Sequence, residues 1–519
     1  MSLFRSTYIS YLKISAMLLR TKSIIAALAL LSLVSVTLIA HLLSRRGAPA
    51  AEWIPSLKGP PIEPCPDKLD WLESLDLTYP IHYAHRDVII SPISDMKRAS
   101  LTKLDKHLFP DFQTIDLTKD PKVELKHCAE PLVLDVPALK KEPSDASHVI
   151  FGMSTTLKRL DDSITQILRW LPHTHARLFV IVIESERVDT PEGQEDIKAV
   201  AADPAQKEAL QSKMRSLGMD VTLVDPLVLQ DSFSEKYFSL VKIMYDNRNE
   251  KTLWTSLLDD DTFFLSIPAV LSMLSKYDPH EKHYVGALSE DWWSVAHYGM
   301  MAFGGAGIFL SEALAEILAN NYRFCKETSH TSAGDIRVLE CINLLTDTKL
   351  SNERDLHQID LDGDLSGIYE NGRLPLSLHH WKTRGGGSVS LPTMHLVADV
   401  CGDCFLQRWQ FGDDMVLTNG YSISLYTNGR LKSMNMEAAE ETWNEPAIVE
   451  GSINGGVAHS LAPIRPKLVL DDEKIQYRLI DSAVVQGGVR QSYLHQGVGE
   501  DIDSLLEIFW IGKKGENPA

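Results

Sequence analysis

The sequence has little positive charge. Its 51 Lys and Arg residues stand against 70 Asp and Glu residues, which gives a formal net charge of −19. Because non-specific nucleic-acid binding needs a basic surface, this balance argues against that class of function. It fits a folded body that binds neutral ligands or ligands bridged by a cation, since a metal ion converts local acidity into affinity for phosphate.

The sequence is also poor in cysteine, with six in 519 residues. Only Cys401 and Cys404 form a C-x-x-C pair, whereas a zinc ribbon uses two such pairs, so we expect a local disulfide here. No Asn-x-Ser/Thr sequon occurs, so N-glycosylation gives no evidence about the compartment. Glycine and proline are not in excess, and the length fits one large domain with extensions, or two domains.

An apolar segment without formally charged residues covers 23–43 and is long enough to cross a bilayer. Positive charges flank it on both sides: Arg5, Lys13, Arg20 and Lys22 before it, Arg45 and Arg46 after it. The N-terminal excess predicts a cytoplasmic tail over 1–22, a signal anchor over 23–43 and a lumenal body. A cleaved signal peptide is the alternative, but the apolar run is too long and no convincing small-residue cleavage site follows. All six cysteines follow the segment, which is compatible with an oxidising lumen.

Regular secondary structure follows a proline-rich stretch, which we assign to a stem over 44–84. Strand patterns at 147–156, 176–185, 219–227 and 252–258 alternate with helix patterns at 160–172 and 234–248. This alternation predicts an α/β domain with a mainly parallel central sheet, which we place at 85–395. Beyond it, two Asn-Gly pairs at 419–420 and 428–429 predict β-hairpins in a β-rich C-terminal extension over 396–519.

Three adjacent aspartates, Asp259, Asp260 and Asp261, follow the last of these strand patterns. Neighbouring carboxylates repel one another and are costly to desolvate. In open α/β sheets ligands bind at the carboxyl ends of the strands, and Mg²⁺ or Mn²⁺ ions bind carboxylate oxygens there while leaving positions for phosphate. The triplet therefore predicts a metal–nucleotide site; the alternative is an exposed acidic turn that caps the next helix.

Further candidates occur downstream, each with a plainer alternative. Gly304 and Gly305 would let a ligand approach the backbone closely, or form only a tight turn. Asp335 lies where a helix pattern begins, a position that the helix dipole favours for any carboxylate. His379 and His380 form a pair in an apolar run and are ligand candidates, although a core histidine is usually structural.

Trp292 and Trp293 follow a strand pattern at 283–288. Because sugars stack on aromatic faces, either ring could form a platform for an acceptor. The alternative, which we weigh equally, is a buried anchor of the loop.

The motifs occur in one order along 147–385. They are LLDDDTFF (257–264), YVGALSE (284–290), MAFGGAGIFLS (301–311), CKETSHTSAGDIRVLEC (325–341), DLHQIDLDGDLSG (355–367) and PLSLHHWK (375–382). This combination resembles the Fringe-like inverting β-1,3-glycosyltransferases, and most closely a fungal and plant branch of type II membrane proteins. The resemblance implies a GT-A-type, Rossmann-like domain, a UDP-sugar donor and a Mn²⁺ cofactor. It also implies that 357–364, which lacks the spacing of an EF-hand, is a structural loop.

By position in these motifs, the resemblance assigns Asp259 and Asp261 to the metal and Asp260 to the ribose side of the nucleotide. His379 matches the distant metal ligand of the family, and His380 is the neighbouring alternative.

The same comparison makes Asp335 the catalytic base and places Thr155 where the first strand meets the nucleotide. Lys158 or Arg159 would replace the basic residue that relatives carry shortly after this threonine. The last inference from the resemblance is a disulfide between the two cysteines that bracket the base, Cys325 and Cys341.

Together these residues predict an inverting transferase that moves a hexose or N-acetylhexosamine from a UDP-sugar to a glycan or glycoprotein hydroxyl, in β-1,3 linkage. Asp335 would take the proton of the acceptor hydroxyl while the metal stabilises the leaving diphosphate. We expect a Golgi or endoplasmic-reticulum membrane location. The alternatives are an inactive lumenal glycan-binding or interaction protein on the same fold, and a metal-dependent phosphohydrolase or nucleotidyltransferase.

Overall fold

The computed structural model describes most of the chain after residue 68. The described residues are 69–109, 111–119, 125, 129–138, 144–189, 195–382, 389–444, 461, 463–499 and 501–512. The predicted anchor at 23–43 lies outside them, as do Cys65 and Cys128. Within these ranges, no helix combines the length and the apolar character needed to span a bilayer. The anchor therefore stays a prediction.

A seven-stranded sheet organises the α/β part of the protein, with the strand order β14-β12-β13-β10-β5-β6-β9. Its strands are β5 (Val149–Thr155), β6 (Arg177–Val182), β9 (Asp220–Val224), β10 (Trp254–Leu257), β12 (Tyr284–Gly286), β13 (Ile308–Ser311) and β14 (Leu350–Asn352). Strand β13 is antiparallel to both neighbours, and all other pairs are parallel. The prediction of a mainly parallel sheet in an α/β domain is confirmed.

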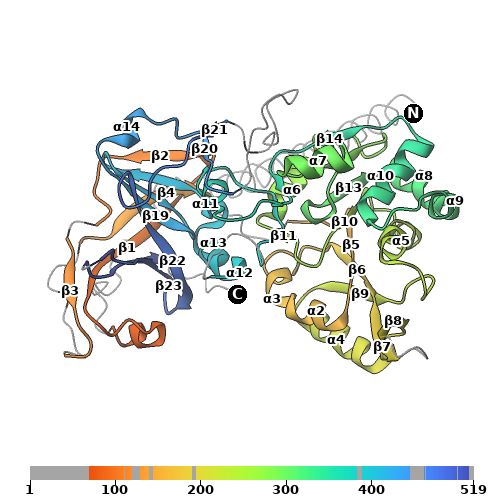
Figure 1. Ribbon diagram of the computed structural model, residues 1–519, viewed down its shortest axis with the longest axis horizontal. Coiled ribbons are helices and arrows are strands. Elements are labelled where there is room, and N and C mark those ends of the chain that lie inside the picture. Colours follow the sequence, from red (N-terminus) through yellow and green to blue (C-terminus); the bar gives the residue numbers. More distant parts are fainter. Residues whose placement is uncertain are drawn as a thin grey trace, which may run out of the picture. The chain divides into compact units, whose positions relative to one another are not determined.

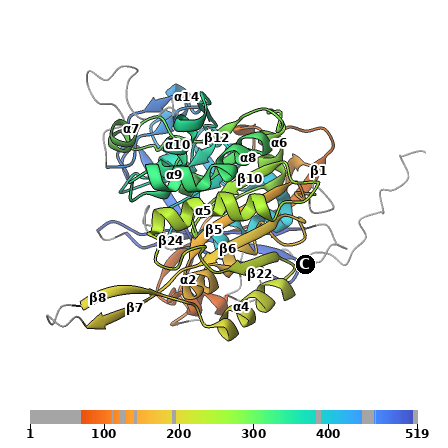
Figure 2. The ribbon, with the colours of Figure 1, turned by 90° about the vertical axis from the view of Figure 1, so that its right-hand side faces the viewer.

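Helices cover both faces of this sheet (Figures 1 and 2). They are α2 (Leu157–Asp162), α3 (Ile164–Ile167), α4 (Pro204–Ser216), α5 (Phe233–Asp246), α6 (Ile267–Leu274), α7 (Trp292–Tyr298), α8 (Glu312–Asn320), α9 (Tyr322–Thr328) and α10 (Gly334–Leu345). Successive side chains of a strand point to opposite faces. Val149 thus joins the core under α2, α3, α4 and α6, whereas Ile150 joins the core under α5, α8 and α10.

A second, ten-stranded sheet has the order β2-β17-β18-β19-β22-β23-β24-β1-β3, with β4 paired to β1. Its strands are β1 (Ile81–Ile93), β2 (Leu101–Leu104), β3 (Gln113–Ile115), β4 (Leu132–Pro137), β17 (Arg408–Phe411), β18 (Met415–Thr418), β19 (Ser422–Tyr426), β22 (Lys474–Val485), β23 (Gly488–His495) and β24 (Ser504–Ile511). The region beyond 396 is β-rich, as predicted. Strands β1 to β4 lie in this sheet too, although we placed most of them at the start of the α/β domain. The cause is the parallel pairing of β1 with β24, from His82 opposite Ser504 to Ile89 opposite Ile511.

Only one of the two Asn-Gly pairs forms a hairpin. Asn419 and Gly420 lie in the tight turn between β18 and the antiparallel β19, as predicted. Asn428 and Gly429 both have positive φ, but they lead into the short helix α14 (Arg430–Ser433), so the second hairpin prediction is wrong. The strand that pairs with β19 on its other side is β22, nearly 50 residues downstream.

Smaller elements complete the described fold. Short strands form three further sheets: β11 (Phe263–Phe264), β15 (Leu356–His357) and β16 (Ser377–Leu378); β20 (Ala439–Glu440) and β21 (Ile464–Arg465); β7 (Glu184–Asp189) and β8 (Glu195–Val200). Short helices are η1 (Asp70–Leu75), η2 (Gly304–Ala306), α11 (Ser366–Tyr369), α12 (Leu391–Met394), η3 (His395–Val397), α13 (Ala398–Cys401) and η4 (Gly402–Cys404).

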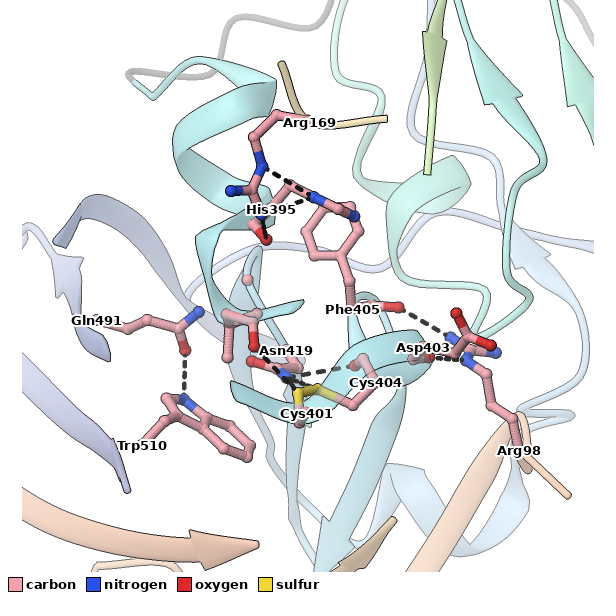
Figure 3. The surroundings of a disulfide bond; sticks show 12 residues. Arg98, Arg169, His395, Cys401, Asp403, Cys404, Phe405, Asn419, Gln491 and Trp510 are labelled. Carbon is pink, nitrogen blue, oxygen red and sulfur yellow. Dashed lines mark hydrogen bonds between the residues drawn. A yellow bond between two sulfur atoms is a disulfide. The ribbon is translucent and has the colours of Figure 1, made fainter. Parts of the chain in front are cut away.

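Both expected disulfides are present. The bond between Cys325 and Cys341 joins α9 to α10. The bond between Cys401 and Cys404 closes a tight turn, where the side-chain amide of Asn419 donates a hydrogen bond of 3.2 Å to the Cys404 carbonyl oxygen (Figure 3).

Candidate active site

The acidic triplet lies in the turn between β10 and β11, at the carboxyl end of the central strand β10. Strand β11 pairs antiparallel with β16, with Phe263 opposite Leu378. This pairing brings His379, the residue after β16, to the aspartates. Its Nε2 lies 2.9 Å from Oδ1 of Asp261 and 3.4 Å from Oδ2 of Asp259. The structure thus brings together the three residues that the family resemblance assigns to the metal.

The charges of these groups are coupled. Burial raises the pKa of Asp259 to about 6, and the carboxylates of Asp335, Asp261 and Asp260 act in the same direction, against His379. The side chain of Asp259 nevertheless stays 36% exposed, so protein surrounds it but a ligand can reach it. Burial alone would lower the pKa of His379, but its hydrogen bond to Asp261 and the nearby negative charges raise it. The two carboxylates thus favour the protonated form of the imidazole.

The donor atoms fit a hard divalent cation, since two carboxylates and an imidazole are ligands that Mn²⁺ accepts. In the part of the chain that the structure describes, no group of three or more His, Cys, Asp or Glu side chains is already arranged to hold a metal ion. Nε2 of His379 faces both carboxylates. A metal held by these residues would need the neutral form of His379, because only neutral imidazole ligates.

Asp260 turns away from this group and is 5% exposed. Its carboxylate accepts hydrogen bonds from the Arg159 guanidinium and from the Thr155 hydroxyl. The sequence did not decide between Lys158 and Arg159 as the basic residue of the site. In the structure Arg159 reaches the acidic turn, whereas Lys158 pairs with Asp162 one turn along α2. Contacts of Thr155 and Asp260 with a nucleotide stay predictions.

Gly304 and Gly305 let the protein itself close around the acidic turn. A Cβ atom on Gly305 would lie 2.1 Å from Nδ1 of His379, and one on Gly304 would lie 2.7 Å from the Tyr237 hydroxyl. Tyr237, which sequence reasoning missed, is buried in the second turn of α5, against Gly334 as well. Both glycines are thus required for packing, and their contact with a nucleotide stays a prediction.

Asp335 lies in the first turn of α10, as expected. Its carboxylate accepts hydrogen bonds from the backbone N–H groups of Gly304, at 3.2 Å, and Ile336, at 2.8 Å. Burial raises its pKa above the ordinary value, although these two N–H groups oppose the shift. The bond from Gly304 links the glycine segment, and through it the acidic turn, to the predicted base.

A second carboxylate–histidine pair lies beside the first. Nδ1 of His380 is 3.2 Å from Oδ1 of Asp360, whose Oδ2 accepts a hydrogen bond of 2.6 Å from the Ser289 hydroxyl. His380 is therefore directed to Asp360, and His379 is the histidine that faces Asp259 and Asp261. Sequence reasoning missed Asp360, because it lies in the segment that we interpreted as a structural loop.

Two further residues after His380 contact the acidic edge and had no sequence signal of their own. The indole N–H of Trp381 donates a hydrogen bond of 2.8 Å to the Asp261 carbonyl oxygen. The Lys382 ammonium donates one of 3.1 Å to the Ser163 hydroxyl, and the charges of Asp260 and Asp261 act on it. Arg159 and Lys382 thus supply two cationic groups beside the turn.

The two candidate acceptor residues differ in exposure. Trp293 is 55% exposed on α7, which excludes a buried anchor for this ring, whereas Trp292 is half-buried. A separate cavity of about 360 Å³ lies at the opposite edge of the sheet, where β5, β6 and β9 begin, among residues such as Arg177 and Asp220. Because ligands of open α/β sheets bind at the carboxyl ends of the strands, the acidic edge is the better candidate for the active site.

Comparison with known families supports a relation to glycosyltransferases in part of the chain. A family described as "Protein of unknown function, DUF604" matches residues 294–386, a segment that holds Gly304, Asp335 and His379. A human protein named β-1,3-glucosyltransferase is 27% identical over 150 residues. The match covers 28% of this chain and 28% of that relative, so the chain spans well under half of the length of the curated relative.

Solved structures give weaker likenesses. A glycosyltransferase, GlyE of Streptococcus pneumoniae TIGR4, has a TM-score of 0.29 and 12% identity over 46% of this chain and 54% of its own. Mouse xyloside xylosyltransferase 1 has a TM-score of 0.26 and 12% identity over 41% of this chain and 85% of its own. Scores this low do not carry a function over.

Proposed function

We propose that this protein is a Mn²⁺-dependent inverting glycosyltransferase that moves a hexose or N-acetylhexosamine from a UDP-sugar to a glycan or glycoprotein hydroxyl, in β-1,3 linkage. One observation carries the proposal: Asp259, Asp261 and His379 converge at the carboxyl edge of the sheet, and Gly304 links them to Asp335. The local similarity to a human β-1,3-glucosyltransferase supports the same reaction class.

Asp335 is the base in this proposal. Its carboxylate is held by two backbone N–H groups, and its raised pKa makes it a better proton acceptor. The acceptor oxygen attacks the anomeric carbon as the bond from that carbon to the UDP oxygen breaks. The proton of the acceptor hydroxyl passes to Asp335, and the bonding electrons leave with UDP. Attack from the face opposite the leaving group inverts the configuration, as in inverting glycosidases.

Asp259, Asp261 and His379 would hold the cation, and the cation would stabilise the negative charge that develops on the diphosphate. Arg159 and Lys382 lie at the same edge and can contribute positive charge to the diphosphate. Asp260 keeps Arg159 in place through a bidentate contact, so its own role is to position the Arg159 guanidinium. A Golgi or endoplasmic-reticulum membrane location, through an anchor at 23–43, belongs to this proposal and depends on the sequence pattern.

The test is UDP release from a panel of UDP-sugars by the full chain, with and without Mn²⁺. We expect release that requires Mn²⁺ and is lost in the Asp261→Ala variant, while Asp347→Ala, which removes a solvent-exposed carboxylate, serves as the control. UDP binding without release in the wild type would favour the inactive glycan-binding alternative. Neither binding nor release with any donor would contradict the proposal.

A further inference from the structure

The segment between Ser289 and Gly304 leaves the candidate site and returns to it. At its start, the Ser289 hydroxyl donates a hydrogen bond of 2.6 Å to Asp360. The next residue, Glu290, is fully buried and accepts a hydrogen bond of 2.7 Å from the Ile359 N–H group. At its end, the Gly304 N–H group donates to Asp335. Both ends are therefore fixed on the carboxylates of the site.

Helix α7 lies within this segment, and both views show it in the same part of the molecule as α10, which carries Asp335 (Figures 1 and 2). Trp293 lies four residues after Ser289, and Met300 lies four residues before Gly304. Since consecutive Cα atoms are 3.8 Å apart, each of these two residues is within about 15 Å of the residue that contacts a site carboxylate. An oligosaccharide acceptor can span that distance.

Helix α7 and the two residues after it expose large apolar side chains. Trp293, Tyr298 and Met300 are 55%, 38% and 63% exposed, and Trp293 is the sole exposed tryptophan among those that the structure describes. Large apolar side chains gathered on one surface mark a binding site more often than scattered ones do. These side chains thus form a surface that a ligand would cover.

The rings are held in place before any ligand binds. The Trp293 ring stacks on that of His297 at 4.6 Å and an interplanar angle of 9°, and Tyr298 stands at 89° to both. Asp291 caps the helix through the N–H groups of Trp293 and Ser294. The stack orders the indole while 55% of the side chain stays exposed, so little side-chain entropy is lost on binding.

The chemistry of the surface selects a neutral partner. Residues 292–303 contain no Asp, Glu, Lys or Arg, although 23% of the whole chain is charged. The negative π face of an aromatic ring attracts the positive C–H groups on the apolar face of a pyranose. A nucleotide, a phosphate or an acidic peptide would find no cationic side chain in this stretch.

We propose that the exposed face of α7, formed by Trp293, His297 and Tyr298, with Met300 two residues beyond the helix, is the subsite that binds a neutral pyranose ring of the acceptor glycan. This inference rests on the proposed function, because the acceptor role follows from the hydrogen bonds that attach both ends of the α7 segment to carboxylates of the candidate site. It assigns Trp293, rather than Trp292, as the specificity-determining ring.

The first experiment measures binding without turnover. Saturation-transfer-difference NMR on the full chain uses methyl β-D-galactopyranoside and methyl β-D-glucopyranoside as separate probes. Trp293→Ala is compared with Phe112→Ala, which removes an aromatic side chain of similar exposure, 47%, outside α7. We expect the C–H protons of at least one probe to receive saturation from the wild type and the control. The affinity should fall about tenfold or more in Trp293→Ala, as burial of one aromatic side chain predicts. No transfer from the wild type, or an equal affinity in Trp293→Ala, overturns the subsite.

The second experiment separates the subsite from the reaction. With an acceptor that the wild type uses, Trp293→Ala should raise the acceptor KM about tenfold or more and leave the donor KM unchanged. An unchanged acceptor KM overturns the subsite and leaves the proposed function intact. If the wild type turns over no UDP-sugar but still binds a pyranoside through Trp293, the proposed function fails and the sugar-binding surface stands. If the pyranosides do not bind and sedimentation shows a dimer that Trp293→Ala dissociates, the face is a self-association surface and the subsite is refuted.

Discussion

Two groups of buried acidic side chains differ in how their charge is balanced. Beside the ten-stranded sheet, Glu370 and Glu440 share the Lys474 ammonium at 3.4 and 2.9 Å, and Glu440 also pairs with Arg465 at 2.7 Å. At the edge of the seven-stranded sheet, Asp260 pairs with Arg159, whereas Asp259 and Asp261 share the His379 imidazole and Asp335 accepts hydrogen bonds from backbone N–H groups.

The pKa values follow this difference. Burial opposes ionisation of Glu440, but Lys474 and Arg465 lower its pKa below the ordinary value. Burial and neighbouring carboxylates raise the pKa of Asp259 to about 6, and His379 compensates only in part. A complete set of partners indicates a structural role, whereas an incomplete set indicates a place where a cationic ligand completes the balance. The predictions below test this distinction.

The largest expected effect is on turnover. Asp335→Asn removes the proposed proton acceptor, and loss of a general base typically lowers the rate by ~10²–10⁴-fold. Initial rates of UDP-sugar transfer measure the loss, and calorimetry should show unchanged UDP binding, because the variant keeps its shape. Asp347→Asn is the matched control, since its carboxylate is exposed to solvent. Near-normal turnover by Asp335→Asn would rule it out as the base.

The next largest expected effect is on the stability of the buried ion-paired group around Lys474. Lys474→Met leaves Glu370 and Glu440 without their shared cation in a buried position and should lower the free energy of unfolding by about 3–5 kcal/mol. Urea denaturation followed by tryptophan fluorescence measures this loss. Lys432→Met, which breaks an exposed pair with Asp413, should cost less than about 1 kcal/mol. Equal effects of the two variants would mean that burial of the pair is not decisive.

A third prediction concerns pH. Burial would lower the pKa of His85, but Asp87, at 2.8 Å, and Glu507, at 3.3 Å, raise it to about 9. The folded state then binds a proton that the unfolded state releases above its ordinary pKa of about 6.5. The stabilisation is complete below pH 6.5, falls as the pH rises and is lost above pH 9, with a total of roughly 3 kcal/mol. Melting temperatures between pH 6 and 10 should show this decline in the wild type and a flatter profile in His85→Gln.

The smallest expected effect is a gain in folding stability rather than a loss. Asp259→Asn removes one of several repelling carboxylates and should stabilise the fold above pH 6, where the aspartate is ionised in the folded state. The gain should not exceed about 1 kcal/mol, because solvent screens a side chain that is 36% exposed. Glu440→Gln is the counterpart and should lower the melting temperature, since it weakens satisfied ion pairs. Destabilisation by both variants would contradict the proposed difference in charge balance between the two acidic groups.

The local pattern of the α/β part was predictable from the sequence. Continuous apolar runs predicted β5, β6 and β10, and the helix periodicity predicted α5. Since the triplet followed a strand pattern, its place at the carboxyl edge was predictable as well. The neighbours of the triplet were not. Tyr237 and Asp360 had no signal of their own, because an ordinary helical tyrosine and a loop aspartate look alike at functional and structural sites.

The sequence by itself determined the residue types at the candidate site, the succession of the sheet strands β5, β6, β9 and β10, and the cysteine pair at Cys401 and Cys404. Only the tertiary structure decided which distant segments meet. The pairing of β11 with β16 brings His379 to aspartates 118 to 120 residues earlier, and the pairing of β1 with β24 moves the first strands into the second sheet. Contacts of this kind depend on which strand edges are complementary and which segments share a core. The periodicity of neighbouring residues carries no information about such long-range pairing.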